Sequence, residues 1–163
     1  VRHLSDKVIV EDHLEVGYNY RMTDIQAAVG IRQLEKLDSI VERRREIAEF
    51  YLNELKDIEC IRLPFESEND FTNWQSFSVY IKSSCPVSRN EIMQKMLDLG
   101  ISTRRGIMTS HRETAYKNRG VDISLPVSED AADRSIVLPL YVPMSQEEMD
   151  YVMKHFKACL NQD

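Results

Sequence analysis

The feature that most constrains the fold of this 163-residue chain is a long helical pattern over residues 24–56. Thr23 precedes the run and Gln26 follows three positions later, which is the spacing of a capping box. Apolar or aromatic side chains then recur along one side, at Leu34, Leu37, Val41, Ala48, Tyr51 and Leu55. Because Asp38 followed by Ser39 would cap a second helix, the pattern predicts either one helix or two helices broken near Leu37.

The rest of the chain predicts a small sheet with helices between its strands. Strands are expected over residues 58–63, 74–81, 101–104 and 136–140, and Phe77, Val79 and Ile81 alternate with polar residues in the second of them. Helices are expected over residues 89–99, 128–135 and 146–160. Residues 105–126 are expected to form an irregular loop.

Capping residues in the sequence mark where these helices begin and end. Ser88 is a cap for the first of the three, and Gly100 after it suits the left-handed position that ends many helices. Ser145, with Glu148 three residues later, is a second capping box. The order of elements predicts an α/β (α+β) fold: a mostly antiparallel sheet with helices on one face, after a long N-terminal helix. We expect an arm over residues 1–22 and one domain over residues 23–163.

Composition excludes several classes of function. Hydrophobic residues make up 42% and charged residues 29%, which is typical of a globular protein. No apolar run reaches the roughly 20 residues of a membrane span, and the formal charge of -6 argues against nucleic-acid binding. The start lacks both a signal-peptide core and a Met, so the sequence is expected to begin inside a longer protein. Three widely spaced cysteines show no zinc pattern and are interpreted as reduced thiols in the cytoplasm.

Two groups of polar residues are candidates for binding, and each has a simpler structural interpretation. Asn19 lies between Tyr18 and Tyr20; an asparagine in a loop either contacts a ligand or shapes a turn. Arg21 suits either an anionic ligand or an ion pair within the protein. The second group is Arg104, Arg105 and His111. These three form either an anion site or a solvated basic loop.

Several segments, in this order, resemble the DegT/DnrJ/StrS family of sugar aminotransferases. Residues 17–28 read GYNYRMTDIQAA, the segment that carries the likeness most clearly. The others are the arginines 43–45, residues 100–104 with His111 and Tyr116, residues 125–132, residues 138–141, and residues 144–148. The likeness covers nearly the whole chain.

The resemblance implies the fold of the small C-terminal domain of a type I aminotransferase that uses pyridoxal phosphate (PLP). It implies that Asn19, with Tyr18 and Arg21 beside it, contacts the PLP phosphate of the neighbouring subunit in a homodimer with shared active sites. It also implies that Arg104, Arg105 and His111 face a nucleotide sugar.

The family holds PLP on a lysine in a Ser/His-rich segment before a Gly-Glu-Gly-Gly turn. No lysine of this sequence has that context. Lys7, Lys36, Lys56 and Lys82 are expected in the arm, on helix faces or at a strand end. We therefore expect no catalytic residue in this chain and no covalent binding of PLP to it.

Three functions follow as hypotheses. The leading one is the C-terminal segment of a PLP-dependent nucleotide-sugar aminotransferase, which takes its amino group from glutamate, acts in polysaccharide or natural-product synthesis, and is inactive without the lysine. The alternative is a stand-alone dimerisation or binding module without catalytic activity. A nucleic-acid-binding regulator is the third, but the chain's glutamates interleave with its arginines and its net charge is acidic.

Overall fold

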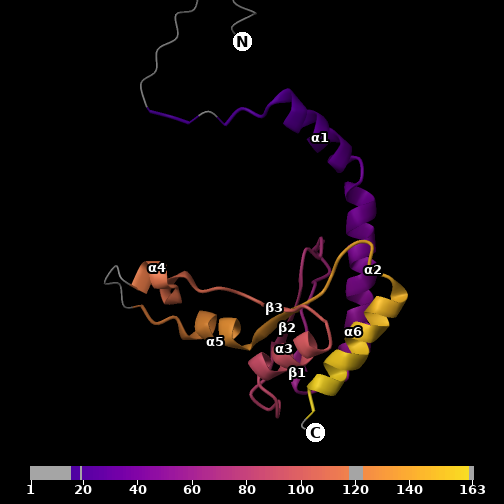
Figure 1. Ribbon diagram of the computed structural model, residues 1–163, viewed down its shortest axis with the longest axis vertical. Helices are drawn as coiled ribbons and strands as arrows, with labels where there is room; N and C mark the ends of the chain where they lie inside the picture. The colour runs from indigo at the N-terminus through magenta and orange to yellow at the C-terminus, as the bar shows by residue number, and fades with distance from the viewer. Residues whose placement is uncertain (1–15, 19, 118–122, 162–163) are drawn as a thin grey trace, which may run out of the picture. The chain divides into compact units, whose positions relative to one another are not determined.

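The structure is a computed structural model that describes residues 16–18, 20–117 and 123–161 (Figure 1). The chain divides into two compact units, residues 1–36 and residues 37–163. Among the described residues, no helix is both long and apolar enough to cross a membrane. The predicted boundary between residues 22 and 23 stays a prediction.

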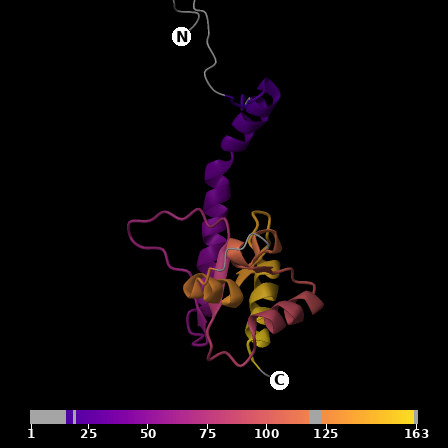
Figure 2. The same ribbon diagram turned by 90° about the vertical axis from the view of Figure 1, so that its left-hand side faces the viewer.

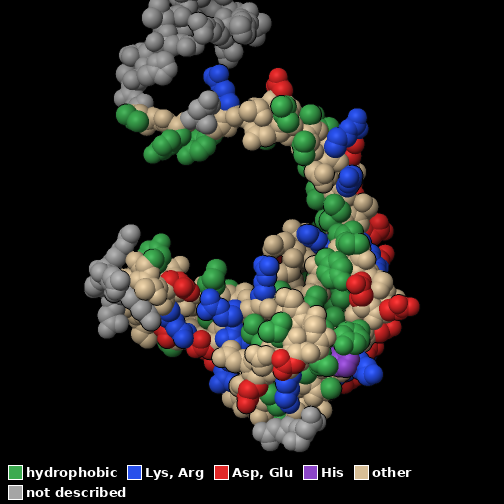
Figure 3. All heavy atoms as spheres, viewed as in Figure 1, with side chains coloured by type: hydrophobic (Ala, Val, Ile, Leu, Met, Phe, Trp, Pro, Cys, Tyr) green, Lys and Arg blue, Asp and Glu red, His purple; other side chains and the backbone are tan. Residues whose placement is uncertain are grey.

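The described part of the first unit contains one helix, α1 (Asp24–Leu34). The predicted capping box is confirmed: the Gln26 N–H donates to Thr23 Oγ1 at 3.3 Å, and the Thr23 N–H donates to Gln26 Oε1 at 2.9 Å. None of the residues of α1 is buried. Space-filling spheres show hydrophobic side chains exposed along this helix (Figure 3).

The second unit begins with α2 (Leu37–Leu55), so the predicted break near Leu37 is confirmed. Asp38 and Ser39 lie in the first turn of α2 rather than ahead of it, because only two residues separate α1 from α2. Burial rises along the helix. Leu37 is exposed, whereas Ala48 and Leu55 are fully buried.

Among the described residues, the sheet has four strands, all antiparallel, in the order β1-β2-β4-β3. They are β1 (Ile61–Arg62), β2 (Phe77–Ile81), β3 (Arg104–Arg105) and β4 (Ser135–Leu138). Burial alternates along β2 as predicted, with Phe77, Val79 and Ile81 buried. Val79 pairs with the buried Ile136 of β4, so one face of the sheet forms the floor of the core.

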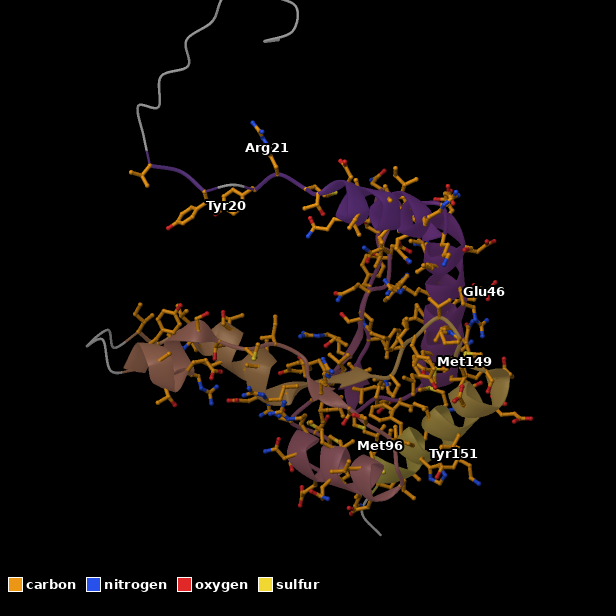
Figure 4. The ribbon with its side chains drawn as sticks, turned by 45° about the horizontal axis from the view of Figure 1, so that its top comes forward. Tyr20, Arg21, Glu46, Met96, Met149 and Tyr151 are labelled. Carbon is orange, nitrogen blue, oxygen red and sulfur yellow. The ribbon has the colours of Figure 1, made fainter. Side chains whose placement is uncertain are left out.

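Three helices of the second unit supply the other side of the core: α2, α3 (Arg89–Asp98) and α6 (Gln146–Cys159), and α6 lies beside both of the others (Figure 1). Met96 of α3 and Met149 of α6, labelled in Figure 4, are both buried. The Tyr51 ring packs edge-on to Phe77 at 5.2 Å, and its hydroxyl donates to the Pro139 carbonyl at 2.8 Å. The predicted fold class, helices with a small antiparallel sheet, is confirmed.

The remaining boundaries show where the predictions fail. The strands expected over residues 58–63 and 101–104 shrink to two residues each, and the second shifts to Arg104–Arg105. The loop expected over residues 105–126 contains a 3-10 turn, η2 (Ser110–Arg112), and a short helix, α4 (Thr114–Lys117). Beyond it, α5 (Pro126–Arg134) begins two residues earlier than predicted.

Between β1 and β2 a long loop extends away from the sheet (Figure 2). Arg45 of α2 holds it: its guanidinium bonds both carboxylate oxygens of Glu66 at 2.8 Å and the Thr72 carbonyl at 2.7 Å. The Arg45 side chain also lies over the Phe71 ring, 4.3 Å from its centroid. These contacts explain how a loop without strands keeps a fixed course.

Candidate functional site

The residues predicted to contact the cofactor lie in the segment before α1. Asn19 lies outside the described residues. Tyr18 and Tyr20 are 83% and 87% exposed, with ring centroids 6.0 Å apart. Figure 4 shows Tyr20 and Arg21 projecting from this segment in different directions. A guanidinium and a tyrosine hydroxyl are hydrogen-bond donors, so the side chains of Arg21 and Tyr18 fit a phosphate in chemical type.

Arg104 and Arg105, predicted to bind substrate, form β3 at the edge of the sheet. Arg104 pairs with Val137 and Arg105 with Ile136. Since successive side chains of a strand point to opposite faces, the two arginines leave β3 in opposite directions. Both are exposed, and Arg105 lies 3.9 Å from a Glu113 carboxylate oxygen. They therefore cannot form one cluster while β3 keeps this pairing.

His111, the third predicted residue, lies in η2 and contacts α5. Its Nε2 is 2.9 Å from Glu129 Oε1, and its side chain is only 12% exposed. The Leu125 N–H donates to the same Glu129 oxygen at 2.8 Å. The backbone hydrogen bond from Leu125 and then the hydrogen bond with His111 lower the pKa of Glu129. In this arrangement His111 connects the loop after β3 to the start of α5.

A second ion pair strengthens this connection. Arg112 donates to both carboxylate oxygens of Asp133, at 2.9 and 3.0 Å. Glu129 and Asp133 are four residues apart, so they lie on one side of α5 and meet the adjacent His111 and Arg112. We call these four residues the clasp. Glu129, Arg112 and Asp133 were not predicted as site residues, although the four-residue spacing of the two acids was a usable signal in the sequence.

Gly106 sets the direction in which the chain leaves β3 toward the clasp. Its N–H donates to the Ser135 carbonyl at 3.1 Å. A Cβ at this position would lie 2.3 Å from Ser135 Cβ and 2.9 Å from Ser78 Oγ. Only glycine therefore permits this close approach to β4.

Beside the clasp, α5 also contacts the sheet face that points away from the core. The Tyr80 hydroxyl donates to Asp130 Oδ2 at 2.5 Å, and Arg134 Nε donates to Asp130 Oδ1 at 2.8 Å. These contacts lower the pKa of Asp130, the Tyr80 hydrogen bond most strongly. The Arg62 guanidinium lies 4.3 Å from the centre of the Tyr80 ring. Tyr80 and Arg134 thus both donate to the Asp130 carboxylate, and this hydrogen bonding connects α5 to β2.

A separate pocket of about 580 Å³ lies between α6 and the turns before β3 and after β4. Its lining includes Tyr141, Met144, Glu148 and Tyr151, and none of the predicted site residues. The Tyr151 hydroxyl donates to the Leu99 carbonyl at 3.2 Å and so connects α6 to the end of α3. Within the described ranges, no three His, Cys, Asp or Glu side chains gather as a metal site would require.

Solved structures share this arrangement of sheet and helices, and they define the class of protein. The chain is similar to the aminotransferase TlmJ from Streptoalloteichus hindustanus, with 30% identity and a TM-score of 0.75 over 84% of this chain and 36% of that one. It is similar to the PLP form of the sugar aminotransferase Spr1654 from Streptococcus pneumoniae, with 28% identity and a TM-score of 0.82 over 91% of this chain and 38% of that one. DesV from S. venezuelae gives 26% identity and a TM-score of 0.81 over 93% and 40% of the two chains.

The fold is therefore that of part of a sugar aminotransferase, and this chain spans 36 to 40% of the length of these three proteins. The model of the DegT/DnrJ/EryC1/StrS aminotransferase family matches residues 2–157. The chain belongs to that family. Family members are PLP-dependent, in agreement with the PLP form among the structural neighbours.

Proposed function

We propose that this chain is the C-terminal part of a PLP-dependent nucleotide-sugar aminotransferase. The enzyme transfers an amino group from glutamate to a keto-sugar nucleotide in the cytoplasm, and it works as a homodimer with shared active sites. The observation that carries the proposal is the family match over residues 2–157, together with sugar aminotransferases as structural neighbours. PLP, when bound, supplies the electron sink for amino transfer.

In this proposal the segment before α1 faces the cofactor of the partner subunit. Asn19, Tyr18 and Arg21 contact the PLP phosphate. Support comes from the exposure of Tyr18 and from the donor chemistry of Arg21. The chain alone does not transaminate, because none of its lysines has the sequence context of the family's cofactor lysine.

The substrate side of the proposal assigns the diphosphate of the nucleotide sugar to Arg104, Arg105 and His111. Because the two arginines leave β3 on opposite faces, only one of them contacts a given phosphate while β3 stays paired. His111 takes part through the clasp, which positions the loop after β3 against α5.

Binding of uridine and thymidine diphosphate, measured by calorimetry on this chain, tests the substrate assignment. We expect Arg104→Ala or Arg105→Ala to weaken binding at least tenfold. Arg32→Ala, which removes an exposed arginine of α1 without a proposed role, is the matched control, and Arg112→Ala tests the clasp separately. If neither β3 arginine affects binding while Arg112→Ala abolishes it, the assignment to β3 is wrong.

Treatment with PLP followed by borohydride tests the cofactor assignment. At equimolar PLP we expect only low, scattered modification of exposed amines, with no single lysine modified stoichiometrically, because no lysine has the sequence context of the cofactor lysine. A stable adduct on one specific lysine would contradict the proposal.

A second candidate function, a dimerisation or binding module, is favoured by α1. Its Ile25, Val29 and Leu34 side chains are 79%, 57% and 68% exposed. Apolar side chains gathered on one element often mark an interface. Sedimentation velocity at several concentrations distinguishes the candidates: a module of this kind dimerises alone, and replacing Ile25 and Val29 with glutamine abolishes the dimer.

A further inference from the structure

Two of the three cysteines lie near each other where β1 begins and β2 has just ended, at the β1 edge of the sheet. Cys60 directly precedes β1, and its carbonyl accepts the Lys82 N–H at 2.9 Å. The chain then turns back, and the Cys85 N–H donates to the Lys82 carbonyl at 3.0 Å. The hairpin register and this turn therefore bring together two residues that are far apart in sequence.

The two side chains also influence each other. Burial, and then the neighbouring Cys85 thiol, raise the pKa of Cys60. Both side chains are half-buried, and both thiols are free. The Cys85 thiol donates to the Leu160 carbonyl at 3.8 Å, so a disulfide with Cys60 requires this thiol to turn away from that carbonyl.

Small molecules have access to one of the two thiols. Cys85 lines a polar pocket of about 490 Å³ together with Lys82, Ser88, Arg89 and Glu91. Cys159 differs, because its side chain is only 4% exposed. A small disulfide in solution can therefore approach Cys85 while Cys159 stays covered.

From this juxtaposition we propose that Cys60 and Cys85 are a modification site that forms a reversible disulfide by exchange with a low-molecular-weight disulfide of the glutathione class. The Cys85 thiolate attacks one sulfur of the oxidised reagent, which forms a mixed disulfide and releases one reagent thiolate. The Cys60 thiolate then attacks the Cys85 sulfur and releases the second. The two protein thiols lose two electrons and two protons, and the reagent disulfide becomes two thiols.

Trypsin separates the three cysteines cleanly, so the linkage can be read by mass. Cleavage after Lys56, Arg62, Lys82 and Arg89 places Cys60 in peptide 57–62 and Cys85 in peptide 83–89. Cleavage after Lys157 places Cys159 in the C-terminal peptide.

The experiment incubates the folded chain with oxidised glutathione and digests it without reduction. We expect the intact mass to fall by two hydrogen atoms, peptides 57–62 and 83–89 to be joined, and dithiothreitol to restore the free thiols. Cys159→Ser should leave this linkage intact. In Cys60→Ser the reaction should stop at the first step, with one glutathione retained on Cys85.

Two results would overturn the proposal. One is glutathione attached separately to Cys60 and Cys85 of the parent chain without a linked peptide. The other is a linkage that involves Cys159. Oxidation in guanidinium chloride is the control for folding, because it should produce mixed linkages and so show that the native pairing comes from the fold.

Discussion

The ionised carboxylate of Glu66 helps to hold the loop between β1 and β2 against α2. The Arg45 guanidinium, and then the Thr72 N–H, lower the pKa of Glu66 to about 2. A carboxylate whose pKa is lower in the folded state stabilises the protein at pH values above its unfolded pKa, near 4.3. That contribution is lost as the pH falls from about 5 toward 2.

We therefore expect Glu66→Gln to lower the thermal midpoint near pH 7 and to have progressively less effect as the pH falls toward 2. Thermal unfolding of parent and variant, followed by circular dichroism across this range, measures the difference. Glu68→Gln, at an exposed position two residues along the same loop, is the control. A Glu66→Gln effect that does not shrink in acid would show that the Arg45 pair does not depend on charge.

At Gly106 the prediction concerns steric overlap rather than charge. Gly106→Ala would place a Cβ 2.3 Å from Ser135 Cβ, so β3 or β4 must shift. We expect a loss of about 1–3 kcal/mol in the free energy of unfolding, as for other overpacked positions. Urea unfolding followed by the fluorescence of Trp74 measures it.

Gly30→Ala is the matched control, since a Cβ there meets nothing within 4 Å. It should not lower the stability of the second unit. Equal effects of the two substitutions would mean that the approach of Gly106 to Ser135 is not tight in solution.

At the scale of elements, the sequence correctly predicts features that depend on neighbouring residues. It does not predict features that depend on contacts with distant parts of the chain. The capping boxes at Thr23 and Ser145 and the alternation along β2 are local, and all are confirmed. The predicted lengths of β1 and β3 were wrong, because the length of a strand depends on its partner strand. Each of these edge strands pairs over only two residues. The apolar periodicity predicted Leu34 on the apolar side of the helix, yet Leu34 is exposed. Periodicity identifies the apolar side of a helix, but burial also requires another element to pack against that side.

In the candidate site too, the residue types could be predicted from the sequence, but the contacts between distant residues could not. Residue type and the family resemblance indicated His111, but its partner Glu129 lies 18 positions away in a different helix. No periodicity connects the two positions, because η2 and α5 meet only in the folded chain. The opposite directions of Arg104 and Arg105 likewise depend on the pairing of β3, which was predicted one to three residues too early.

The capping boxes of α1 and α6 have the same chemistry, but their loss should affect stability differently, because α6 packs in the core and α1 has no buried residue. Ser145 caps α6, which buries Met149, Val152 and Phe156 in the core. We expect Ser145→Ala to cost about 1 kcal/mol, which corresponds to a fall of about 4 °C in the thermal midpoint. Differential scanning calorimetry measures this midpoint.

Thr23→Ala is the matched comparison. It removes the same kind of cap from α1, of which no residue is buried, so it should lower helical content without moving the midpoint. If Thr23→Ala lowers the midpoint as much as Ser145→Ala does, α1 contributes to the cooperative core.

At the scale of the whole molecule, the two units have different sources of stability. The buried hydrophobic cluster, from Ile47 to Leu160, lies entirely within residues 37–163. The helix of the first unit has a capping box and an Arg32–Glu35 ion pair at its end, and both are local interactions at exposed positions. Isolated helices of this length are marginal in water, so its order depends on what its apolar side chains contact.

Removal of residues 1–36 tests this division. We expect residues 37–163 to unfold cooperatively, with the same thermal midpoint and the same Trp74 fluorescence as the full chain, because the buried cluster is complete without the first unit. In the full chain, the amides of residues 24–34 should exchange with deuterium within seconds, while those of α6 stay protected. A truncated chain that is unfolded, or an α1 as protected as α6, would show that the exposed apolar side chains of α1 are covered in solution and that the two units form one cooperative body.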